Sequence, residues 1–378
     1  MRIIHLLPER VNHLTSNIVR FFAHNFENTG TNITDHLFIK FQEYSTLTKE
    51  EKDYYSLPNL SPDQLLFIPP TVFNLFKALY KVTQKDILII HSGRIRWIWL
   101  VLFMMPKLWK RSVLTTWGAE IEVFERHSEA TDFYERSMYL VERIILPRLR
   151  AICTLTEGEY KIIQSVFPNC DNYFRAITSS TPINGNYTPK SPIRENHRHI
   201  KVLLNQSANY AGRHLEALDW LSKFRENDMS ITCPLSYGPK DEASKIIQYG
   251  KYIFGDRFQA FTELLPYNVY RRLLDDIDIL VFNHLTQNGL GNLYIFLSKG
   301  KVVYIRNEAT TFEMLKNLEI EVRETKSIPG LTFEEFAEPL SEEASAMNIR
   351  QFNKYLSSEA AAMTWGDLFR SIRVENGR

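Results

Sequence analysis

The sequence predicts an α/β protein of two doubly wound, Rossmann-like domains, followed by C-terminal helices. Short apolar runs alternate with amphipathic, helix-like stretches along most of the 378 residues, which is typical of parallel sheets covered by helices on both faces. The alternation breaks once, at 179–199, where Pro, Asn and Ser accumulate ahead of basic residues. Because this length suits two domains, we interpret the break as a surface linker. The expected domains are 1–185 and 198–358, and a last helix, 359–378, is expected to pack back on the first domain.

Strands are expected at the apolar runs that end in a turn. They are 3–7, 36–41, 65–68, 86–90, 112–116 and 151–154 in the first domain, and 199–204, 231–235, 258–261, 279–282 and 302–305 in the second. Helices are expected at 18–26, 71–83, 95–109, 131–150, 157–167, 213–225, 242–250, 266–275, 293–298 and 360–374. Parallel strands place their carboxyl ends along one edge, so the ligand-binding loops should follow the strands.

The composition narrows the class of protein. With 44% hydrophobic and 24% charged residues, it is that of a globular protein. The net charge of +1 creates no overall field that would attract nucleic acid, so no such partner is expected. The three cysteines lack CxxC spacing, which favours buried thiols in a reducing compartment. The first residues contain too short an apolar run for a signal peptide, and no run reaches the roughly 18 residues of a membrane span.

The most informative stretch is 278–313. It combines a strand, a glycine-bearing loop, a helix and a second strand, which together form one right-handed βαβ unit. Gly289 and Gly291 allow backbone N–H groups to turn toward a ligand, and the following helix adds the positive end of its dipole. This pattern is typical of a phosphate site, although a tight loop without a ligand has it too. A second polar cluster, 306–308, follows the next strand at the same expected edge.

Paired domains of this kind occur in periplasmic-type binding proteins, dehydrogenases and GT-B glycosyltransferases. Neither domain begins with a strand–GxGxxG–helix fingerprint, which argues against a dinucleotide enzyme. The lack of a signal peptide argues against a periplasmic binding protein. A GT-B enzyme needs a nucleotide diphosphate on the second domain and an acceptor on the first, with the ligands in a cleft between them. The glycine loop meets the first of these needs.

Several segments, spread in order over most of the chain, carry a family resemblance. They are His5, the Arg20-Phe21-Phe22 run, Trp117-Gly118-Ala119-Glu120, Leu203-Leu204-Asn205-Gln206-Ser207 with His214-Leu215-Glu216-Ala217-Leu218, Pro234-Leu235-Ser236-Tyr237-Gly238, and Gln287-Asn288-Gly289-Leu290-Gly291-Asn292. In these segments the chain resembles the TDP-N-acetylfucosamine:lipid II N-acetylfucosaminyltransferases of enterobacterial common antigen synthesis, glycosyltransferase family 56, which have WGAD, PMGYP and QQGIGT. The chain departs at Glu120 (Asp in the family), at Asn292 (Thr), and at Gln206, within a turn that is usually Gly-Asn-Ser-Gly.

The resemblance implies a cofactor-free transfer of a deoxy amino sugar, such as N-acetylfucosamine, from a TDP donor to a polyprenyl-diphosphate-linked saccharide. It places the protein at the cytoplasmic face of the bacterial inner membrane, with the acceptor and membrane side on the first domain. A UDP- or GDP-sugar donor is an alternative. A non-catalytic nucleotide- or sugar-binding protein on the same fold is another.

The donor site is expected in the loops after the strands of the second domain. Gly289, Gly291 and Asn292 would hold the leaving diphosphate through backbone N–H groups. Ser207 would face them from another turn, and Arg306 would add a fixed positive charge, unless it is only a solvated arginine at a strand end. The other expected donor residues are Asn205, Ser236, Tyr237, Asn283, Gln287, Leu290 and Glu308.

Glu120 is the expected general base, because burial at a strand end can raise the pKa of a carboxylate toward neutrality. It could instead cap the next segment. His13, at the first strand-to-helix turn, is the second candidate. Residues expected on the acceptor side are His5, Asn17, His91, Trp117 and Gly118, although histidines in apolar strands such as His5 and His91 are often core residues.

Asp276-Ile277-Asp278 has the DxD pattern of metal-binding glycosyltransferases. It lies between a helix end and a buried strand, where carboxylates commonly mark a turn. We therefore expect no metal site, with the helix dipole and Arg306 in place of Mg²⁺.

The segment 94–111 is the candidate membrane contact. It contains three tryptophans, basic flanks and an apolar middle too short to span a bilayer. Tryptophan with lysine or arginine suits the interfacial zone, and basic residues attract anionic lipids. Arg143, Arg148 and Arg150 could extend the patch. A core helix with basic ends has the same pattern, and a mixture of the two is our expectation.

Overall fold

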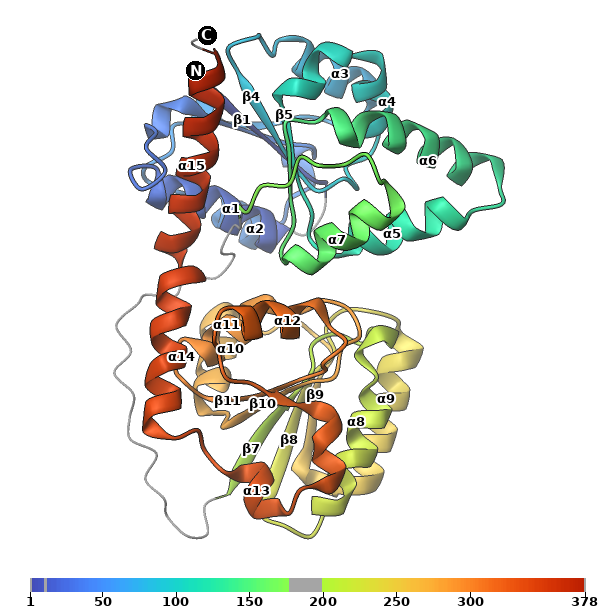
Figure 1. The fold of residues 1–378 in the computed structure, drawn as a ribbon, viewed down its shortest axis with the longest axis vertical. Helices are drawn as coiled ribbons and strands as arrows, with labels where there is room; N and C mark the ends of the chain where they lie inside the picture. The colour runs from blue at the N-terminus through green and yellow to red at the C-terminus, as the bar shows by residue number, and fades with distance from the viewer. Residues whose placement is uncertain (1, 10–11, 177–198, 377–378) are drawn as a thin grey trace. The chain divides into compact units, whose positions relative to one another are not determined.

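The computed structural model describes residues 2–9, 12–176 and 199–376, which form two compact units (Figure 1). Unit 1 comprises the described residues up to 176 together with 358–376, and unit 2 comprises 199–357. The predicted linker, 179–199, falls almost entirely outside the described residues. Each unit contains one parallel sheet with helices, so the predicted α/β class is confirmed.

Unit 1 contains a six-stranded parallel sheet in the order β3-β2-β1-β4-β5-β6. Its strands are β1 (Ile3–Leu7), β2 (His36–Lys40), β3 (Leu65–Phe67), β4 (Ile87–His91), β5 (Ser112–Thr115) and β6 (Ala151–Cys153). Its helices are α1 (Asn12–Asn25), α2 (Lys49–Tyr54), α3 (Val72–Tyr80), α4 (Ile98–Met104), α5 (Ala119–Glu129), α6 (Phe133–Ile145), α7 (Glu157–Val166) and α15 (Ser358–Asn376). The strand order reverses between β1 and β4, which makes their carboxyl ends the switch point where doubly wound sheets bind ligands.

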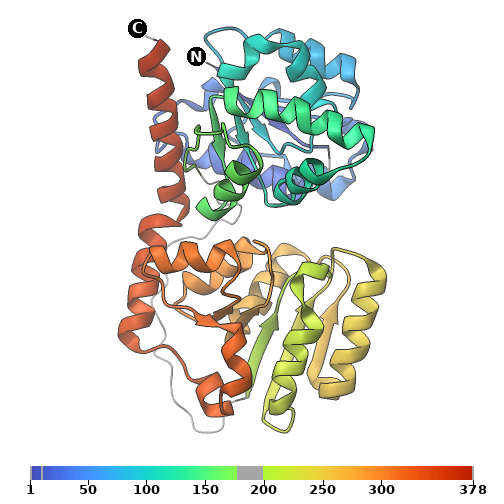
Figure 2. The same cartoon turned by 45° about the vertical axis from the view of Figure 1, so that its right-hand side comes forward.

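The core of unit 1 lies on both faces of this sheet. Every residue of β1, β4, β5 and β6 is buried, as expected of parallel strands covered on both sides. The C-terminal helix α15 packs on unit 1 beside α1 (Figures 1 and 2). There the ring of Trp365 lies edge-on to that of Phe22 in α1, with the ring centroids 5.3 Å apart. A hydrogen bond of 3.3 Å from Asn25 to Ser358 joins the same two helices.

Unit 2 repeats the arrangement, with the order β12-β11-β10-β7-β8-β9 and a switch point between β7 and β10. Its strands are β7 (Ile200–Leu204), β8 (Met229–Pro234), β9 (Phe258–Phe261), β10 (Ile279–Phe282), β11 (Val302–Ile305) and β12 (Arg323–Glu324). Its helices are α8 (His214–Leu221), α9 (Lys240–Phe254), α10 (Tyr267–Asp276), α11 (Leu290–Leu297), α12 (Thr310–Asn317), α13 (Phe333–Ala337) and α14 (Glu342–Tyr355). Residues of α8, α9 and α13 share one apolar cluster with the central strands and so cover one face of the sheet.

The structure differs from the prediction mainly in the helices of both units; α12 of unit 2, for example, was not predicted. The helix expected at 95–109 ends at Met104, because Pro106 interrupts it and a 3₁₀ segment follows. Helix α5 was not predicted, since its charged sequence has few apolar residues to show the helical period. Helix α1 begins at Asn12, earlier than expected, so His13 and Asn17 lie within the helix and not in the turn before it. None of the helices in the described part of the chain is long and apolar enough to cross a membrane.

Candidate functional site

The candidate site in unit 2 is its carboxyl edge, defined here as the loops that follow β7, β8, β10 and β11. Asn205 and Asn283 occupy the switch point, one after β7 and the other after β10. The side-chain oxygen of Asn205 accepts the backbone N–H of Asn283 at 2.7 Å, and its amide donates to the Gly212 carbonyl at 2.7 Å. Both asparagines are fully buried. They therefore tie the two central loops together at the position where this fold binds ligands.

Backbone contacts bring the other predicted donor loops to the same edge. The N–H of Ser207 donates to the Pro234 carbonyl at 2.9 Å, and the N–H of Ala208 donates to the Tyr237 carbonyl at 2.6 Å, so the loops after β7 and β8 are joined. The structure thus brings Ser207 close to the loop that carries Ser236 and Tyr237. The Ser236 hydroxyl itself donates to the Glu263 carbonyl at 2.9 Å.

Gly289 is required where it stands, at the start of α11. Its φ is 68°, and a Cβ at this position would lie 2.6 Å from Oε1 of Gln206 and 2.8 Å from the Phe282 ring. A larger residue would strain this left-handed backbone and would force the Phe282 ring and the end of the Gln206 side chain to move. The predicted glycine loop therefore exists as a close approach of two loops at the amino end of a helix, with Leu290 as its first helical residue.

Two other residues of this loop are buried. The Asn292 side chain donates to the Tyr270 hydroxyl at 2.7 Å, so it is directed toward α10, whereas the prediction for Asn292 concerns its backbone N–H. Burial raises the pKa of Tyr270 to about 12, which leaves that hydroxyl neutral. Gln287 is 7% exposed, and its side-chain oxygen has no hydrogen-bond partner among the described residues.

Residues in left-handed backbone conformations gather at this edge. Asn205 has φ 54°, Ser207 φ 67° and Arg213 φ 49°. Such conformations are unfavourable for residues other than glycine, less so for asparagine, and they concentrate at functional sites where surrounding contacts hold them.

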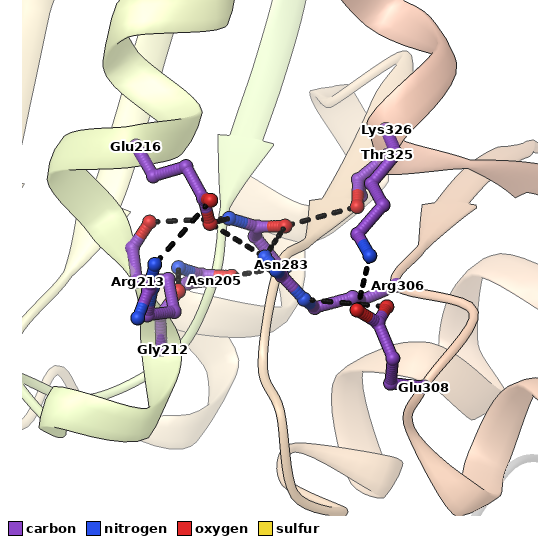
Figure 3. A network of polar contacts seen from close by, with 9 residues as sticks. All are labelled: Asn205, Gly212, Arg213, Glu216, Asn283, Arg306, Glu308, Thr325 and Lys326. Carbon is purple, nitrogen blue, oxygen red and sulfur yellow. Dashed lines mark hydrogen bonds and ion pairs between the residues drawn. The ribbon is translucent and has the colours of Figure 1, made fainter.

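Arg306 follows β11 and lies in a network of polar side chains, not in solvent (Figure 3). Its guanidinium donates to Glu216 at 2.5 Å and to the side-chain oxygen of Asn283 at 3.0 Å. Thr325 donates to the same Asn283 oxygen at 2.9 Å. Burial alone would raise the pKa of Glu216, but the hydrogen bonds from Arg306 and Asn283 outweigh it and lower this pKa. Arg306 thus carries its charge buried and paired.

The pairing changes what Arg306 can do for a ligand. Glu308 lies 3.4 Å from its Nε and also contacts Lys326 (Figure 3). Arg213, Arg306 and Lys326 give three positive charges against two from Glu216 and Glu308, so the network has a net charge of +1. The side chains of Arg213 and Lys326 are 49% and 43% exposed. Arg213 and Lys326 are thus the exposed cations of the network, and each is paired with a carboxylate.

The sequence did not predict four members of this network, namely Arg213, Glu216, Thr325 and Lys326. Only Glu216 gave a signal, as part of the family-like segment 214–218. The others depend on which loops meet at the edge, and no local pattern carries that information.

In unit 1, Glu120 lies at the carboxyl edge, in the first turn of α5, and is 1% exposed. One carboxylate oxygen accepts the Trp117 N–H at 2.8 Å and the other accepts the Ser92 hydroxyl. Gly118, with φ 92°, is the N-cap of α5, so the Trp-Gly turn and the carboxylate form one local structure. Ser92 follows β4 at the switch point. Its φ of 106° lies in a region that residues other than glycine rarely adopt.

A second buried carboxylate, Glu159, belongs to the next loop along the edge. The sequence places 156–159 at this edge but predicts no catalytic or binding role for Glu159. It is 3% exposed, in the first turn of α7, and accepts the Thr156 N–H at 3.0 Å. Burial raises its pKa to about 7, and the charge of Glu120 acts in the same direction. The only feature of the sequence that indicates Glu159 is its position just after the predicted strand 151–154.

His5 and His91 were placed on the acceptor side, with a core role left open. The structure buries both completely in the core, so they do not form an accessible acceptor surface. They belong to a buried chain in which His36 Nδ1 lies 2.8 Å from His5 Nε2, and His5 Nδ1 lies 3.0 Å from His91 Nε2. Thr31 extends the chain at His36 with a contact of 2.8 Å. Burial lowers the pKa of His36 to about 4 and of His91 to about 3, so the rings are neutral at pH 7. They satisfy one another across β2, β1 and β4.

The remaining predicted residues lie elsewhere. Asn17 is half-buried in α1, and the side chain of His13 is outside the described part of the structure. The Asp276-Ile277-Asp278 segment lies at the amino end of β10, where Asp278 accepts the Lys201 N–H at 2.9 Å and Asp276 pairs with the Lys201 side chain. It is therefore at the opposite edge of the sheet from the candidate site. No group of three or more His, Cys, Asp or Glu that could hold a metal occurs among the described residues.

Comparisons with known proteins agree with this architecture. The chain is similar in structure to a sucrose-phosphate synthase from Thermosynechococcus elongatus, with a TM-score of 0.67, 10% identity and coverage of 99% of this chain and 100% of the other. A glycosyltransferase from Rickettsia africae gives a TM-score of 0.60 at 14% identity, covering 100% and 98%. An α,α-trehalose-phosphate synthase from Burkholderia xenovorans gives 0.65 at 9% identity, covering 99% and 100%. These likenesses establish the GT-B fold.

The family is established by sequence. The model of glycosyltransferase group 56, described as 4-alpha-L-fucosyltransferase, matches residues 1–323. The match includes the carboxyl edges of both sheets, with Glu120, Asn205, Asn283 and Arg306. The chain belongs to the 4-alpha-L-fucosyltransferase family of glycosyltransferases, group 56, and is a glycosyltransferase with a GT-B fold.

Proposed function

We propose that this glycosyltransferase moves a deoxy amino sugar, N-acetylfucosamine or a close relative, from TDP to a polyprenyl-diphosphate-linked saccharide. The reaction belongs to the synthesis of a surface polysaccharide at the cytoplasmic face of the inner membrane. The observation that carries the proposal is the convergence of the loops after β7, β8, β10 and β11 at one switch point within a chain of this family.

The donor would bind at the carboxyl edge of unit 2. Gly289 is the N-cap of α11, and Gly291 and Asn292 lie in its first turn. Their backbone N–H groups are at the positive end of the helix, which favours a diphosphate. Because Arg306 is buried and paired, we assign the contact with the diphosphate to the exposed Arg213 and Lys326, which Glu216 and Glu308 position. The DxD-like segment lies at the opposite edge, which supports a metal-independent reaction.

The acceptor would bind at the carboxyl edge of unit 1, beside Trp117 and Gly118. A base removes the proton from the acceptor hydroxyl, the oxygen attacks the anomeric carbon, and the bond to the diphosphate breaks, releasing TDP. We assign the base to Glu120, with His13 as the second candidate. The strained Ser92, which donates to Glu120, can pass a proton to it because a hydroxyl both donates and accepts.

Membrane association would use α4 and α6, which are neighbours in unit 1. The segment 94–111 divides: Trp99 is in the core, whereas Trp97 and Phe103 are 41% and 47% exposed. On α6, Phe133 and Leu140 are 88% and 57% exposed. The exposed basic residues nearby are Arg94, Arg96, Lys107, Lys110, Arg136, Arg143 and Arg148. Exposed apolar side chains among basic ones suit the surface of an anionic bilayer.

Sedimentation with liposomes tests this surface. The protein should sediment with phosphatidylglycerol liposomes and much less with neutral ones, and the Phe103→Ser/Leu140→Ser double variant should lose most of the binding. Tyr252→Ser, which changes an 85% exposed residue of unit 2, is the matched control and should bind as the wild type does. An absence of sedimentation at every salt concentration would contradict the proposed membrane association.

Thermal-shift screening against TDP, UDP, GDP and NAD tests the donor. A ligand that binds only the folded state stabilises it by about 2.7 kcal/mol at a hundredfold its dissociation constant. Stabilisation by TDP alone is expected. Stabilisation by UDP or GDP instead would leave the glycosyltransferase assignment in place but replace TDP as the proposed donor nucleotide. UDP is a reasonable alternative, because the structurally similar trehalose-phosphate synthase is described as UDP-forming. A response to NAD alone would contradict the assignment.

A further inference from the structure

The loop after β4 carries two exposed arginines at the switch point of unit 1. Arg94 and Arg96 stand on either side of Ile95, which is 3% exposed and belongs to the apolar core. The backbone N–H of Arg94 donates to the Ser92 hydroxyl at 3.2 Å, and the same hydroxyl donates to Glu120. The loop is thus anchored in the core by Ile95 and connected through Ser92 to the proposed base.

The backbone on both sides of the arginines has an unfavourable conformation. Ser92 has φ 106° and Trp97 has φ 69°, and among the described residues of unit 1 these two are the non-glycine residues with positive φ. A bulky residue such as tryptophan rarely adopts this conformation. Such residues concentrate at functional sites where surrounding contacts hold them, as they do at the donor edge of unit 2. The loop after β4 is therefore a second candidate for ligand binding.

The charge of the two arginines is not neutralised by a carboxylate. Among the described residues no ion pair or side-chain hydrogen bond to Arg94 or Arg96 occurs, and the Arg96 guanidinium lies over the Trp97 ring, 5.1 Å from its centroid. Arg2 and Arg126, also in unit 1, pair with carboxylates. Residues 87–119 contain five Lys or Arg and no Asp or Glu. Guanidinium groups in such a setting suit phosphate, whose oxygens they bind through paired N–H groups.

The order of groups along this loop matches the order of groups in a lipid-linked acceptor. Ser92 contacts the proposed base, and the two arginines come next. Trp97, Leu100 and Phe103 follow, with exposed fractions of 41%, 45% and 47%. In the proposed acceptor, the saccharide that carries the reacting hydroxyl is joined through a diphosphate to an apolar chain. With the hydroxyl at Glu120 and the chain at the exposed apolar residues, the diphosphate comes to the arginines.

We propose that Arg94 and Arg96 bind the diphosphate of the lipid-linked acceptor. The proposal rests on the proposed function, and it gives these two residues a task separate from membrane association. They hold the acceptor with its saccharide toward Glu120, whereas the other basic residues of α4 and α6 attract the bilayer. A bilayer phosphate has the same chemistry as the diphosphate, so the experiment separates these two sources.

Steady-state kinetics in neutral detergent micelles takes the anionic bilayer out of the measurement. The donor is TDP-N-acetylfucosamine, and the acceptor is one saccharide linked to the polyprenyl chain through either a diphosphate or a monophosphate. Arg94→Gln/Arg96→Gln should raise the KM for the diphosphate-linked acceptor about tenfold or more, with the donor KM and kcat within about threefold, because charged hydrogen bonds to the acceptor alone are lost. This variant should also lose most of the wild-type preference for the diphosphate over the monophosphate. Arg94→Lys/Arg96→Lys, which keeps the charge, should recover part of both.

Lys81→Gln/Lys85→Gln is the control. It also removes two exposed positive charges from unit 1, but these residues precede β4 and so lie at the opposite edge of the sheet. The control should keep the wild-type acceptor KM, and all variants should melt at the wild-type temperature because the substituted side chains are exposed.

Two results would overturn the diphosphate subsite while leaving the proposed function intact. One is an unchanged acceptor KM in Arg94→Gln/Arg96→Gln, even where that variant binds phosphatidylglycerol liposomes less well, since the arginines would then serve the bilayer alone. The other is an equal loss in the arginine and lysine variants, which would show a general effect of charge. A wild-type protein that transfers sugar to neither lipid-linked saccharide would contradict the proposed function itself, and the subsite with it.

Discussion

At the scale of single residues, the network around Arg306 stabilises the carboxyl edge of unit 2, where we propose that the donor binds. We expect Arg306→Gln to lower the free energy of unfolding by about 3 kcal/mol, because Glu216 and Asn283 lose their buried partner. Arg213→Gln removes a 49% exposed charge near the same Glu216 and should cost less than about 1 kcal/mol. Urea denaturation followed by circular dichroism measures both. Equal losses for the two variants would show that burial does not set the strength of this network.

Glu120 allows a test of catalysis that is separate from binding. Glu120→Gln keeps the size of the side chain and an acceptor for the Trp117 N–H, but it cannot take up a proton. We expect turnover to fall by about 10²–10⁴, as for the loss of a general base, while TDP binding is unchanged. Steady-state kinetics and isothermal titration on the same preparation check this. A variant that keeps wild-type turnover would remove Glu120 from the mechanism.

Sequence patterns predicted the positions of individual residues where the signal was local. Gly289 and Arg306 lie at the carboxyl edge of unit 2 as predicted, because a glycine loop and a strand end mark them. The partners of Arg306 were not found, since Glu216 comes from α8 and Thr325 from beyond β12, and only the folded sheet brings them together. His5 and His91 were assigned to the acceptor side because their bonds to each other, across neighbouring strands, leave no trace in the sequence.

At the scale of secondary-structure elements, the strands were predicted well because buried parallel strands are continuous apolar runs. The two-residue strand β12 has no such run and was missed, and α5 was missed because glutamates interrupt its apolar positions. The missed helix bears on the site, since Glu120 lies in its first turn and bonds back to Trp117. Glu120 thus closes the turn before the helix and does not cap α5, whose N-cap is Gly118.

Helix α15 contributes to the core of unit 1 through Trp365, which is fully buried. We expect Trp365→Ala to lower the free energy of unfolding by about 3–5 kcal/mol, the usual cost of a large cavity. Trp365→Phe should cost much less, because it keeps a ring against Phe22 and removes an indole N–H that has no partner among the described residues. Chemical denaturation of the two variants separates these cases. A mild effect of Trp365→Ala would mean that the helix is not part of the cooperative core.

At the scale of the whole molecule, the buried histidines make stability depend on pH. The pKa of His36 is about 4 in the folded protein, where burial lowers it, and about 6.5 in the unfolded chain. As the pH falls below about 6.5, His36 binds a proton in the unfolded chain, whereas in the folded protein it binds one only near pH 4. Stability therefore rises with pH across this window, by about 3 kcal/mol for this residue, and is level above it.

The variant His36→Gln isolates this contribution. Between pH 7 and pH 4 the wild type should lose about 3 kcal/mol more of its unfolding free energy than the variant does. Glu159 has a raised pKa and acts in the opposite direction in both proteins, so it cancels in the difference. Denaturant titrations at several pH values provide the measurement, and parallel curves for the two proteins would contradict the assignment.

Both units have the same strand order, and in each we assign the chemistry to residues of the loops at the switch point. The central claim is that this family member transfers a sugar from TDP to a lipid-linked acceptor. The direct measurement is to incubate the protein with radiolabelled TDP-N-acetylfucosamine and a polyprenyl-diphosphate-linked saccharide, then follow label in the lipid fraction, with UDP- and GDP-sugars and the Glu120→Gln variant in parallel. We predict label in the lipid only with the TDP donor and the wild-type enzyme. Transfer from a UDP- or GDP-sugar instead, or equal transfer by the variant, would contradict the donor or the base assigned here.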